Sequence, residues 1–355
     1  MEAYYYTQMS KLHQSTYHAM KEGITALQSS FSVPRLEARE LSDIFFKLRL
    51  DHPEIFYVTT FTYRFYQDAS HVEFFPEYLF DKNKIREHQK ALESHITKLI
   101  RPVQGKPAKE QEQYIHDFVV QNIRYDKLKK PYSHEIIGAL GQGVSVCEGI
   151  AKAVKILCDR LHIPCIIVIC DADPENGVKY RHAWNLLKLD KSWYHLDCTF
   201  DNTLTNGHQV SADGTAVTAK NDPNTLIRYD YFNLCDEQIY RDHRKAMYPI
   251  PAATDNSRFF YKEAKLSFTK LEDVEKRTVQ AIKKKKPLIF HWRGGYLTRD
   301  VLLELMQKIR DAALTKEMHA IVHVNWPQAV LRAEFTADIP AEEVITDEAD
   351  ESEDE

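Results

Sequence analysis

GQGVSVCEGIAKAVKIL, Gly141–Leu157, begins with the glycines of a loop and continues with the apolar periodicity of a helix. Ser145 precedes Glu148 by three residues, which is the spacing of an N-terminal capping box. The pattern therefore predicts a helix with Ser145 as its N-cap and Cys147 at its second position. Unpaired N–H groups and the positive end of the helix dipole favour a thiolate there. Cys147 is thus the candidate nucleophile, whereas Cys158 falls in mid-helix without such help.

Two further segments predict a β-hairpin that carries a histidine and an acid. RHAWNLLKL, 181–189, and SWYHLDCTF, 192–200, flank the pair Asp190-Lys191. A two-residue turn there pairs 189 with 192 and places 184 opposite 197. His182 and Asp197 then become diagonal neighbours on one face of the sheet. In this interpretation Cys147 attacks, His182 transfers the proton, and Asp197 orients the imidazole ring.

Other interpretations of this hairpin stay open at the level of sequence. A histidine and an aspartate on adjacent strands often form a structural pair with no catalytic role. His195 lies on the same predicted face and is a rival base, although it stands only two residues from Asp197 on one strand. The register is itself assumed, since a three-residue turn would split the set across two faces.

The order VCEGIAKAVKIL, RHAWN and WYHLDCTFD resembles the transglutaminase-like superfamily. In that family a cysteine opens a helix, H-x-W follows on one strand, and W-x-x-x-D-x-T follows on the next. These positions are occupied here by Cys147, by His182 with Trp184, and by Trp193 with Asp197 and Thr199. Tyr125-Asp126 and the later YFNLCDEQI also resemble bacterial members, so the similarity covers about residues 108–245. The resemblance implies an α+β, papain-like fold for this region.

The resemblance also implies a chemistry. The family includes cross-linking transglutaminases, cysteine peptidases and peptide N-glycanases, together with inactive members. We expect thiol-dependent acyl transfer or hydrolysis at amide bonds of a protein or peptide substrate. The absence of C-x-x-C argues against the glycanase branch. The alternatives are an inactive peptide- or protein-binding module of the same fold, and a structural protein that acts through its flanking regions.

Secondary site residues follow from the same interpretation. The backbone N–H of Cys147 supplies one oxyanion donor, and Gln142, five residues upstream, is the candidate for the second. Trp184 and Tyr125 are expected to line the site. No cofactor is expected. A calcium site at Asp197, Thr199, Asp201 and Asn202 is not favoured, because the spacing of an EF-hand loop does not follow.

Composition restricts the class of protein. The 355 residues are 43% hydrophobic and 28% charged, which is ordinary for a globular protein. The net charge is −5, but residues 341–355 hold nine acids and no base, so the rest carries +4. A basic stripe with interleaved aromatic residues, which would indicate nucleic-acid binding, does not occur in the sequence. The first residues do not have the pattern of a signal peptide and no run of 18 apolar residues occurs, so neither a signal peptide nor a membrane partner is expected. Six cysteines without C-x-x-C indicate a reducing cytoplasm, and the family resemblance is to bacterial members.

Four segments are expected along the chain: a mixed α/β N-terminal region at 1–105, a transglutaminase-like core at 106–250, a small α/β C-terminal domain at 260–340, and an acidic disordered tail at 341–355. Helical patterns occupy about 1–30, 36–50, 81–99, 108–123 and 298–313, and a capping box at Thr269–Glu272 is expected to open one more helix. Strand patterns include FYVTTFTYRFYQ, HVEFFPEYLF, IPCIIVICDA, PLIFHW and HAIVHV. The oligomeric state is not indicated.

Overall fold

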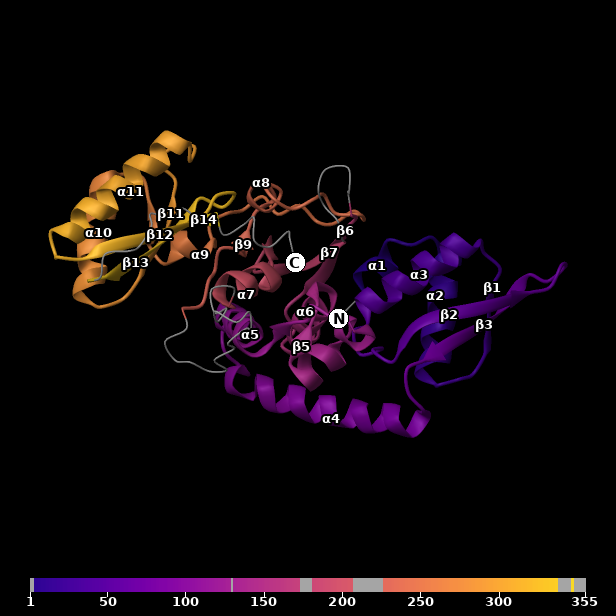
Figure 1. Ribbon diagram of the computed structural model, residues 1–355. Helices are drawn as coiled ribbons and strands as arrows, with labels where there is room; N and C mark the ends of the chain where they lie inside the picture. Colours follow the sequence, from indigo (N-terminus) through magenta and orange to yellow (C-terminus); the bar gives the residue numbers. More distant parts are fainter. Residues whose placement is uncertain (1–2, 129, 173–180, 207–225, 338–345, 348–355) are drawn as a thin grey trace.

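The computed structural model describes residues 3–128, 130–172, 181–206, 226–337 and 346–347. Within these residues the chain has a mixed α+β fold with four small sheets. Figure 1 shows an N-terminal unit and a C-terminal unit on opposite sides of a central core. None of the helices in the described ranges is long and apolar enough to cross a membrane.

The N-terminal unit (3–100) joins helices to a three-stranded antiparallel sheet of order β1-β3-β2. Its elements are α1 (Tyr4–Thr7), α2 (Lys11–Thr25), β1 (Phe31–Pro34), α3 (Ala38–Asp51), β2 (Val58–Phe65), β3 (His71–Tyr78) and α4 (Lys82–Ile100). The Asp81 side chain caps α4 by accepting from the N–H groups of Asn83 and Lys84. Helix α4 then runs beneath the sheet to the core (Figure 1).

The core (101–250) places helix α6 against a four-stranded antiparallel sheet of order β6-β7-β8-β9. Its elements are η1 (Arg101–Val103), α5 (Ala108–Asn122), β4 (Arg124–Tyr125), η2 (Pro131–His134), the π-helix η3 (Ile137–Gln142), β5 (Val144–Ser145), α6 (Cys147–Arg160), β6 (Cys165–Cys170), β7 (His182–Leu189), β8 (Ser192–Leu196), α7 (Cys198–Asn206), β9 (Phe232–Leu234) and α8 (Asp236–Ile239). Strand β6 is buried at every position, as its continuous apolar run predicts.

The β7–β8 hairpin has the predicted register. Leu189 pairs with Ser192 and Asn185 pairs with Leu196, so Asp190 and Lys191 form the two-residue turn. Asp190 has φ of 53°, the left-handed conformation that a tight hairpin turn needs and that aspartate tolerates. The polypeptide leaves the sheet directly after β8, so Asp197 lies at the junction between β8 and α7.

The C-terminal unit (260–337, with 346–347) is a five-stranded mixed sheet of order β10-β11-β13-β12-β14. Its elements are α9 (Phe260–Glu263), β10 (Ser267–Phe268), α10 (Leu271–Lys283), β11 (Leu288–Trp292), α11 (Arg299–Leu314), β12 (His319–Asn325), β13 (Val330–Thr336) and β14 (Thr346–Asp347). Helices α10 and α11 lie side by side along this sheet (Figure 1). Most of the tail that was predicted to be disordered lies outside the described residues. The two that are described pair in parallel with β12.

Two predicted capping boxes are wrong. Helix α6 begins at Cys147 itself with Val146 as N-cap, because the Ser145 hydroxyl donates instead to the backbone oxygen of Ser133 at 2.7 Å. The side chain of Glu148 forms an ion pair with Lys152, with 2.7 Å between Lys152 Nζ and Glu148 Oε1. Helix α10 has Lys270 as its N-cap, and no side chain caps it. Both helices form as predicted, because their apolar periodicity does not depend on the cap.

The N-terminal unit shares its hydrophobic interior with the central core, whereas the C-terminal unit has a hydrophobic cluster of its own. One buried cluster runs without interruption from Tyr17 in α2 to Phe232 in β9, so the N-terminal unit and the central core share a single interior. A separate cluster fills the C-terminal unit, from Phe268 to Ala333. Val330 of β13 belongs instead to the cluster of the core's own sheet, and it marks where the C-terminal unit docks.

Candidate active site

Cys147 is held by a short parallel strand pair that lies directly before helix α6. Tyr125 of β4 pairs with Ser145 of β5, and the N–H of Asp126 donates to the backbone oxygen of Ser145 at 2.9 Å. Gly143 enters this segment with φ of +65°, which favours glycine. The pairing thus fixes the segment two residues before Cys147, and Cys147 becomes the first residue of α6. The thiol is half-buried at the positive end of the helix dipole.

Asp197 holds His182 by a short hydrogen bond. The distance between His182 Nε2 and Asp197 Oδ2 is 2.5 Å, and the aspartate is fully buried. Its other oxygen, Oδ1, accepts from the backbone N–H groups of Thr199 at 2.8 Å and Phe200 at 3.1 Å. The turn into α7 therefore fixes the carboxylate, and the carboxylate fixes the ring.

The thiol of Cys147 lies beside this pair. Its Sγ donates to the backbone oxygen of Arg181 at 4.0 Å, the residue directly before His182. A carboxylate only accepts hydrogen bonds, so Nε2 of His182 carries a hydrogen, and Nδ1 is the nitrogen that is left for the thiol. The structure therefore brings together all three residues that the sequence proposed as catalytic: Cys147, His182 and Asp197.

Charge stabilises this arrangement. Burial disfavours the protonated ring of His182, but Asp197 and then Cys147 outweigh burial and raise the pKa of His182 well above 6.5. Burial likewise raises the pKa of Asp197, but His182 and His243 more than compensate and hold it well below its usual value. These pKa shifts favour an ionised Asp197 carboxylate beside a His182 imidazolium. An imidazolium is the partner that stabilises a thiolate.

The rival base His195 is occupied by two other partners. Its Nδ1 accepts from the indole N–H of Trp184 at 2.9 Å, and its Nε2 lies 2.8 Å from Asp236 Oδ1. Trp184 is only 1% exposed, so it is core and not a lid. Its ring lies nearly parallel to that of His182, with 5.9 Å between centroids and 17° between planes, so the indole stacks against one face of the imidazole.

The two remaining sequence candidates lie in different settings. Tyr125 is close to Cys147: burial first, and then the neighbouring Cys147 and Asp197, raise the pKa of its hydroxyl. Gln142 is exposed at the end of the π-helix. Within the described residues, no hydrogen bond joins the side chain of Gln142 to Cys147 or His182. The oxyanion role of Gln142 stays a prediction.

Sequence reasoning missed His243, which follows α8 and is buried against the site. Its Nε2 lies 2.8 Å from Asp197 Oδ2, the same oxygen that binds His182. Its Nδ1 lies 2.6 Å from Oδ1 of the preceding Asp242. No periodic pattern marks this segment, and the only signal available was the adjacent acid and histidine in YRDHRK, 240–245.

Side-chain donors of His182, Asp197 and His243 lie within 4.8 Å of one another, as in some metal sites. Donors around a zinc ion at normal ligand distances stand about 3 Å apart. The nitrogen of His182 is only 2.5 Å from the carboxylate oxygen, which is a hydrogen-bond distance. The chemistry of this cluster is therefore that of a hydrogen-bonded chain, not of a metal centre.

Asp201 and Asn202, two other residues in the calcium alternative, make contacts that hold the fold together. Asp201 binds Nε2 of His116 at 3.1 Å and accepts from the backbone N–H of Asp230 at 2.8 Å. The amide of Asn202 donates to the backbone oxygens of Val120 and Ile123, each at 2.8 Å. These contacts tie α7 to α5 and to the turn before β9.

Residues 97–198 match the family model described as "Transglutaminase-like superfamily". This chain contains a transglutaminase-like domain. The match includes Cys147, His182 and Asp197, and it ends one residue beyond the last of them. No curated protein matches the chain.

Solved structures that resemble this chain do so at low identity. They include the crystal structure of a TGase, with 13% identity and a TM-score of 0.29, covering 52% of this chain and 54% of that one. A putative cysteine protease from Cytophaga hutchinsonii has 14% identity and a TM-score of 0.26, with 39% of this chain and 61% of that one covered. Menin, whose structure is described as revealing the binding site for Mixed Lineage Leukemia (MLL) protein, has 12% identity and a TM-score of 0.27, covering 85% and 61%. The chain spans about half the length of the TGase that it matches.

Proposed function

We propose that this protein is a thiol enzyme that acts on amide bonds of a protein or peptide substrate. The Cys147 thiolate attacks the amide carbonyl carbon and forms a tetrahedral adduct. The C–N bond then breaks, His182 gives its proton to the departing amine or ammonia, and a thioester remains on Cys147. An acceptor loses its proton to His182 and attacks the thioester carbonyl carbon; the C–S bond then breaks, which releases the acyl product and regenerates the Cys147 thiolate beside the His182 imidazolium.

The observation that carries this proposal is the 2.5 Å contact between His182 and a fully buried Asp197, with Cys147 beside them. The contact assigns a hydrogen to Nε2 and leaves Nδ1 for the thiol. It also raises the pKa of His182, so that the ring is the imidazolium that the proposed thiolate needs as its partner. A structural histidine–aspartate pair would not need a half-buried cysteine at a helix tip beside it.

The acceptor distinguishes the possible reactions. Water gives a peptidase or an amidase, whereas a lysine amine gives a protein cross-link, and both proceed through the same thioester. We favour hydrolysis, because the flanking units are not the β-sandwiches of the animal cross-linking enzymes. All six cysteines are free, which supports a reducing location such as the cytoplasm.

The transition state needs donors for the developing oxyanion. The N–H of Cys147 lies at the start of α6 and has no partner within the helix. The Tyr125 hydroxyl interacts with Cys147 and is one candidate for the second donor, and Gln142 is the other.

The experiment is alkylation of the full chain with iodoacetamide across pH, with the labelled peptide identified by mass spectrometry. Thiolate at Cys147 predicts rapid labelling at pH 6, where an ordinary thiol is about 99% protonated. Labelling that rises only near pH 8.5 would instead indicate the non-catalytic binding module. Turnover on peptide and amine libraries, with Cys147→Ala as the control, then separates hydrolysis from transamidation.

A further inference from the structure

Asp197 has a second histidine on the oxygen that binds His182. Nε2 of His243 lies 2.8 Å from Asp197 Oδ2, and Nδ1 lies 2.6 Å from Asp242 Oδ1. The His243 side chain is only 1% exposed, and the ring is 5.3 Å from that of His182 between centroids. A continuous chain of contacts therefore runs from Asp242 through His243 and Asp197 to His182.

The geometry defines the charge of His243. Both of its ring nitrogens face carboxylate oxygens, and a carboxylate accepts but does not donate, so both nitrogens carry hydrogen. The ring is then an imidazolium. Burial opposes this charge, but Asp197 and Asp242 outweigh burial and raise the pKa of His243. The elements packed against His243 bring five titratable side chains to its ring: Asp197, Asp242, His182, His195 and Tyr231.

Asp242 is in turn held by two donors from different parts of the chain. The hydroxyl of Tyr231 donates to its Oδ2 at 2.6 Å, and the side-chain amide of Gln328 donates to the same oxygen at 3.1 Å. Gln328 belongs to the turn 326–329 between β12 and β13, in the C-terminal unit, and is 1% exposed. The same amide also donates to the backbone oxygen of Gln238 at 3.2 Å.

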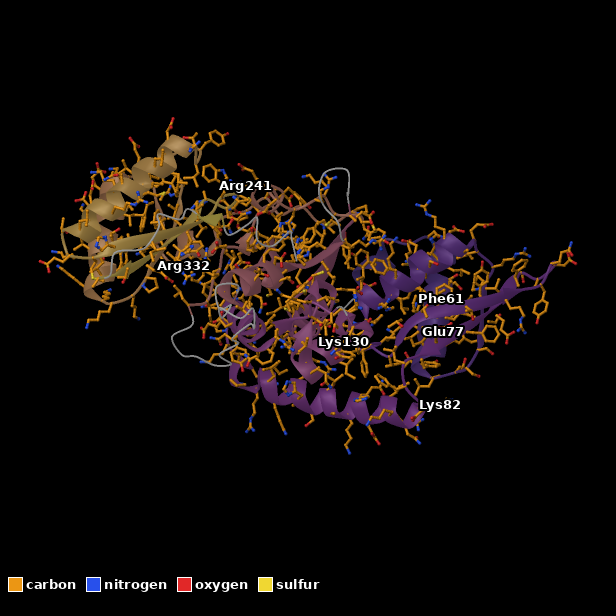
Figure 2. The ribbon with its side chains drawn as sticks, in the orientation of Figure 1. Phe61, Glu77, Lys82, Lys130, Arg241 and Arg332 are labelled. Atoms are coloured by element: carbon orange, nitrogen blue, oxygen red, sulfur yellow. The ribbon has the colours of Figure 1, made fainter. Side chains whose placement is uncertain are left out.

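The turn 326–329 is fastened to the core at further points. The guanidinium of Arg241 donates to the backbone oxygen of Pro327 at 3.3 Å, and Figure 2 shows Arg241 on the side of the core that faces the C-terminal unit. The amide of Asn325 donates to buried Asp230 at 2.9 Å. Gln328 is therefore placed by a built interface, and its contact with Asp242 is not an isolated surface contact.

We propose that His243 and Asp242 are positioning residues for the reaction, and that the C-terminal unit completes their setting through Gln328. The inference rests on the proposed function and names a part of its machinery. His243 holds Asp197 in the orientation that serves His182, and its positive charge offsets part of the negative charge that Asp197 presents to His182. The C-terminal unit then contributes to the reactivity of a thiol that it does not touch.

The primary variant is His243→Gln in the full 355-residue chain. Glutamine keeps a hydrogen-bond donor toward Asp197 but carries no charge. The full negative charge of Asp197 then acts on the protonated ring of His182. Loss of a positive charge about 5 Å away is expected to move the titration of His182 upward by about one pH unit. The double variant H243Q/D242N removes the opposite charge as well, so its shift should be clearly smaller. This ordering depends on charge, and a merely structural role would not produce it.

The readout is the NMR titration of the His182 imidazole, measured in a Cys147→Ala background, together with iodoacetamide profiles in the chain with its cysteine. The NMR arm does not need a reactive thiol. An upward shift in H243Q supports the inference even if Cys147 proves unreactive at pH 6, a result that would reject the proposed function alone. Unchanged titration of His182 in folded H243Q overturns the inference.

Matched controls separate positioning from folding. His291→Gln removes another buried histidine, which bonds Ser267 in the C-terminal unit, and should leave the His182 titration unchanged. Gln328→Ala is expected to slow Cys147 alkylation at pH 6 by two- to fivefold, whereas Gln280→Ala, exposed on α10, should not. If the single His243 variant does not fold, the double variant and Gln328→Ala decide the question. Equal alkylation rates in the Gln328 and Gln280 variants would overturn the role of the C-terminal unit.

Discussion

The indole N–H of Trp184 donates to Nδ1 of His195 at 2.9 Å, and this contact removes His195 from the list of candidate bases. With Nδ1 accepting, Nε2 carries the hydrogen that points at Asp236, 2.8 Å away. Burial, which Asp236 does not fully offset, lowers the pKa of His195. His195 is therefore a neutral ring with both nitrogens in use, whereas His182 keeps one nitrogen for Cys147.

Exchanging each histidine for glutamine should separate these roles. We expect His182→Gln to slow Cys147 alkylation at pH 6 by about two orders of magnitude, because the thiol loses the imidazolium that stabilises its ionised form. His195→Gln should keep the rate within about threefold, while it lowers thermal stability through the unpaired indole N–H of Trp184. Equal loss of reactivity in both variants would contradict the assignment of His182.

Asp197 should make stability depend on pH in a defined window. Its lowered pKa gives stability that is present above 3.8, the usual value, and is lost as the pH falls through the folded value. The raised pKa values of His182 and His243 give stability that is complete below 6.5 and is lost as the pH rises through their folded values. All three contributions coexist between about pH 4 and 6.5.

Asp197→Asn should therefore cost most inside that window. We expect a loss of about 3–5 kcal/mol in the free energy of unfolding near pH 5.5, because the His182 imidazolium loses its carboxylate partner and His243 keeps only Asp242. The difference from wild type should shrink above pH 7 and below pH 3. Urea unfolding at five pH values measures it, and a difference that is constant across pH would show that the ring charges are not coupled to Asp197.

Lys152 is expected to hold the start of α6 to the N-terminal unit. Its fully buried ammonium lies 2.8 Å from Glu135 and 2.7 Å from Glu148, and Arg49 of α3 pairs with both acids. Lys152→Met leaves the buried carboxylate of Glu135 and the half-buried carboxylate of Glu148 to share Arg49, so we expect a loss of about 3–5 kcal/mol. Lys98→Met, exposed on α4, should change stability by less than about 0.5 kcal/mol. Chemical denaturation compares the two variants, and similar losses would contradict this role.

The hairpin and the helix were predictable because their signals are local. Asp190-Lys191 tolerates the conformation of a two-residue turn, and the alternation on either side then determines which side chains share a face. The cap of α6 was not predictable, because the Ser145 hydroxyl prefers the backbone oxygen of Ser133, a partner that the fold brings in from outside the helix. Cys147 nevertheless stands at the helix tip, since the apolar spacing alone sets where α6 runs.

His243 could not be found from sequence for the opposite reason. Its partners are Asp197, 46 positions earlier, and the neighbouring Asp242, and no period or spacing connects them. The contact exists only because the segment after α8 folds back over β7 and β8. The same holds for Gln328, whose partner Asp242 is 86 positions away and in another unit. Long-range polar contacts of this kind follow from topology and not from local pattern.

Tyr125 and Gln142 can be ranked as oxyanion donors by a paired substitution. Tyr125 lies against Cys147 in the parallel β4–β5 pair, whereas Gln142 is exposed at the end of the π-helix. Loss of one oxyanion donor costs about 100- to 1,000-fold in kcat when the donor is well placed. We expect Tyr125→Phe to lower kcat on an amide substrate by at least about tenfold with little change in KM, because the donor acts on the transition state. Gln142→Ala should change kcat by less than about threefold, since an exposed amide is mobile and already solvated. A larger effect at Gln142 would mean that substrate binding reorganises the loop before α6, and the oxyanion role would then return to the residue that the sequence first suggested.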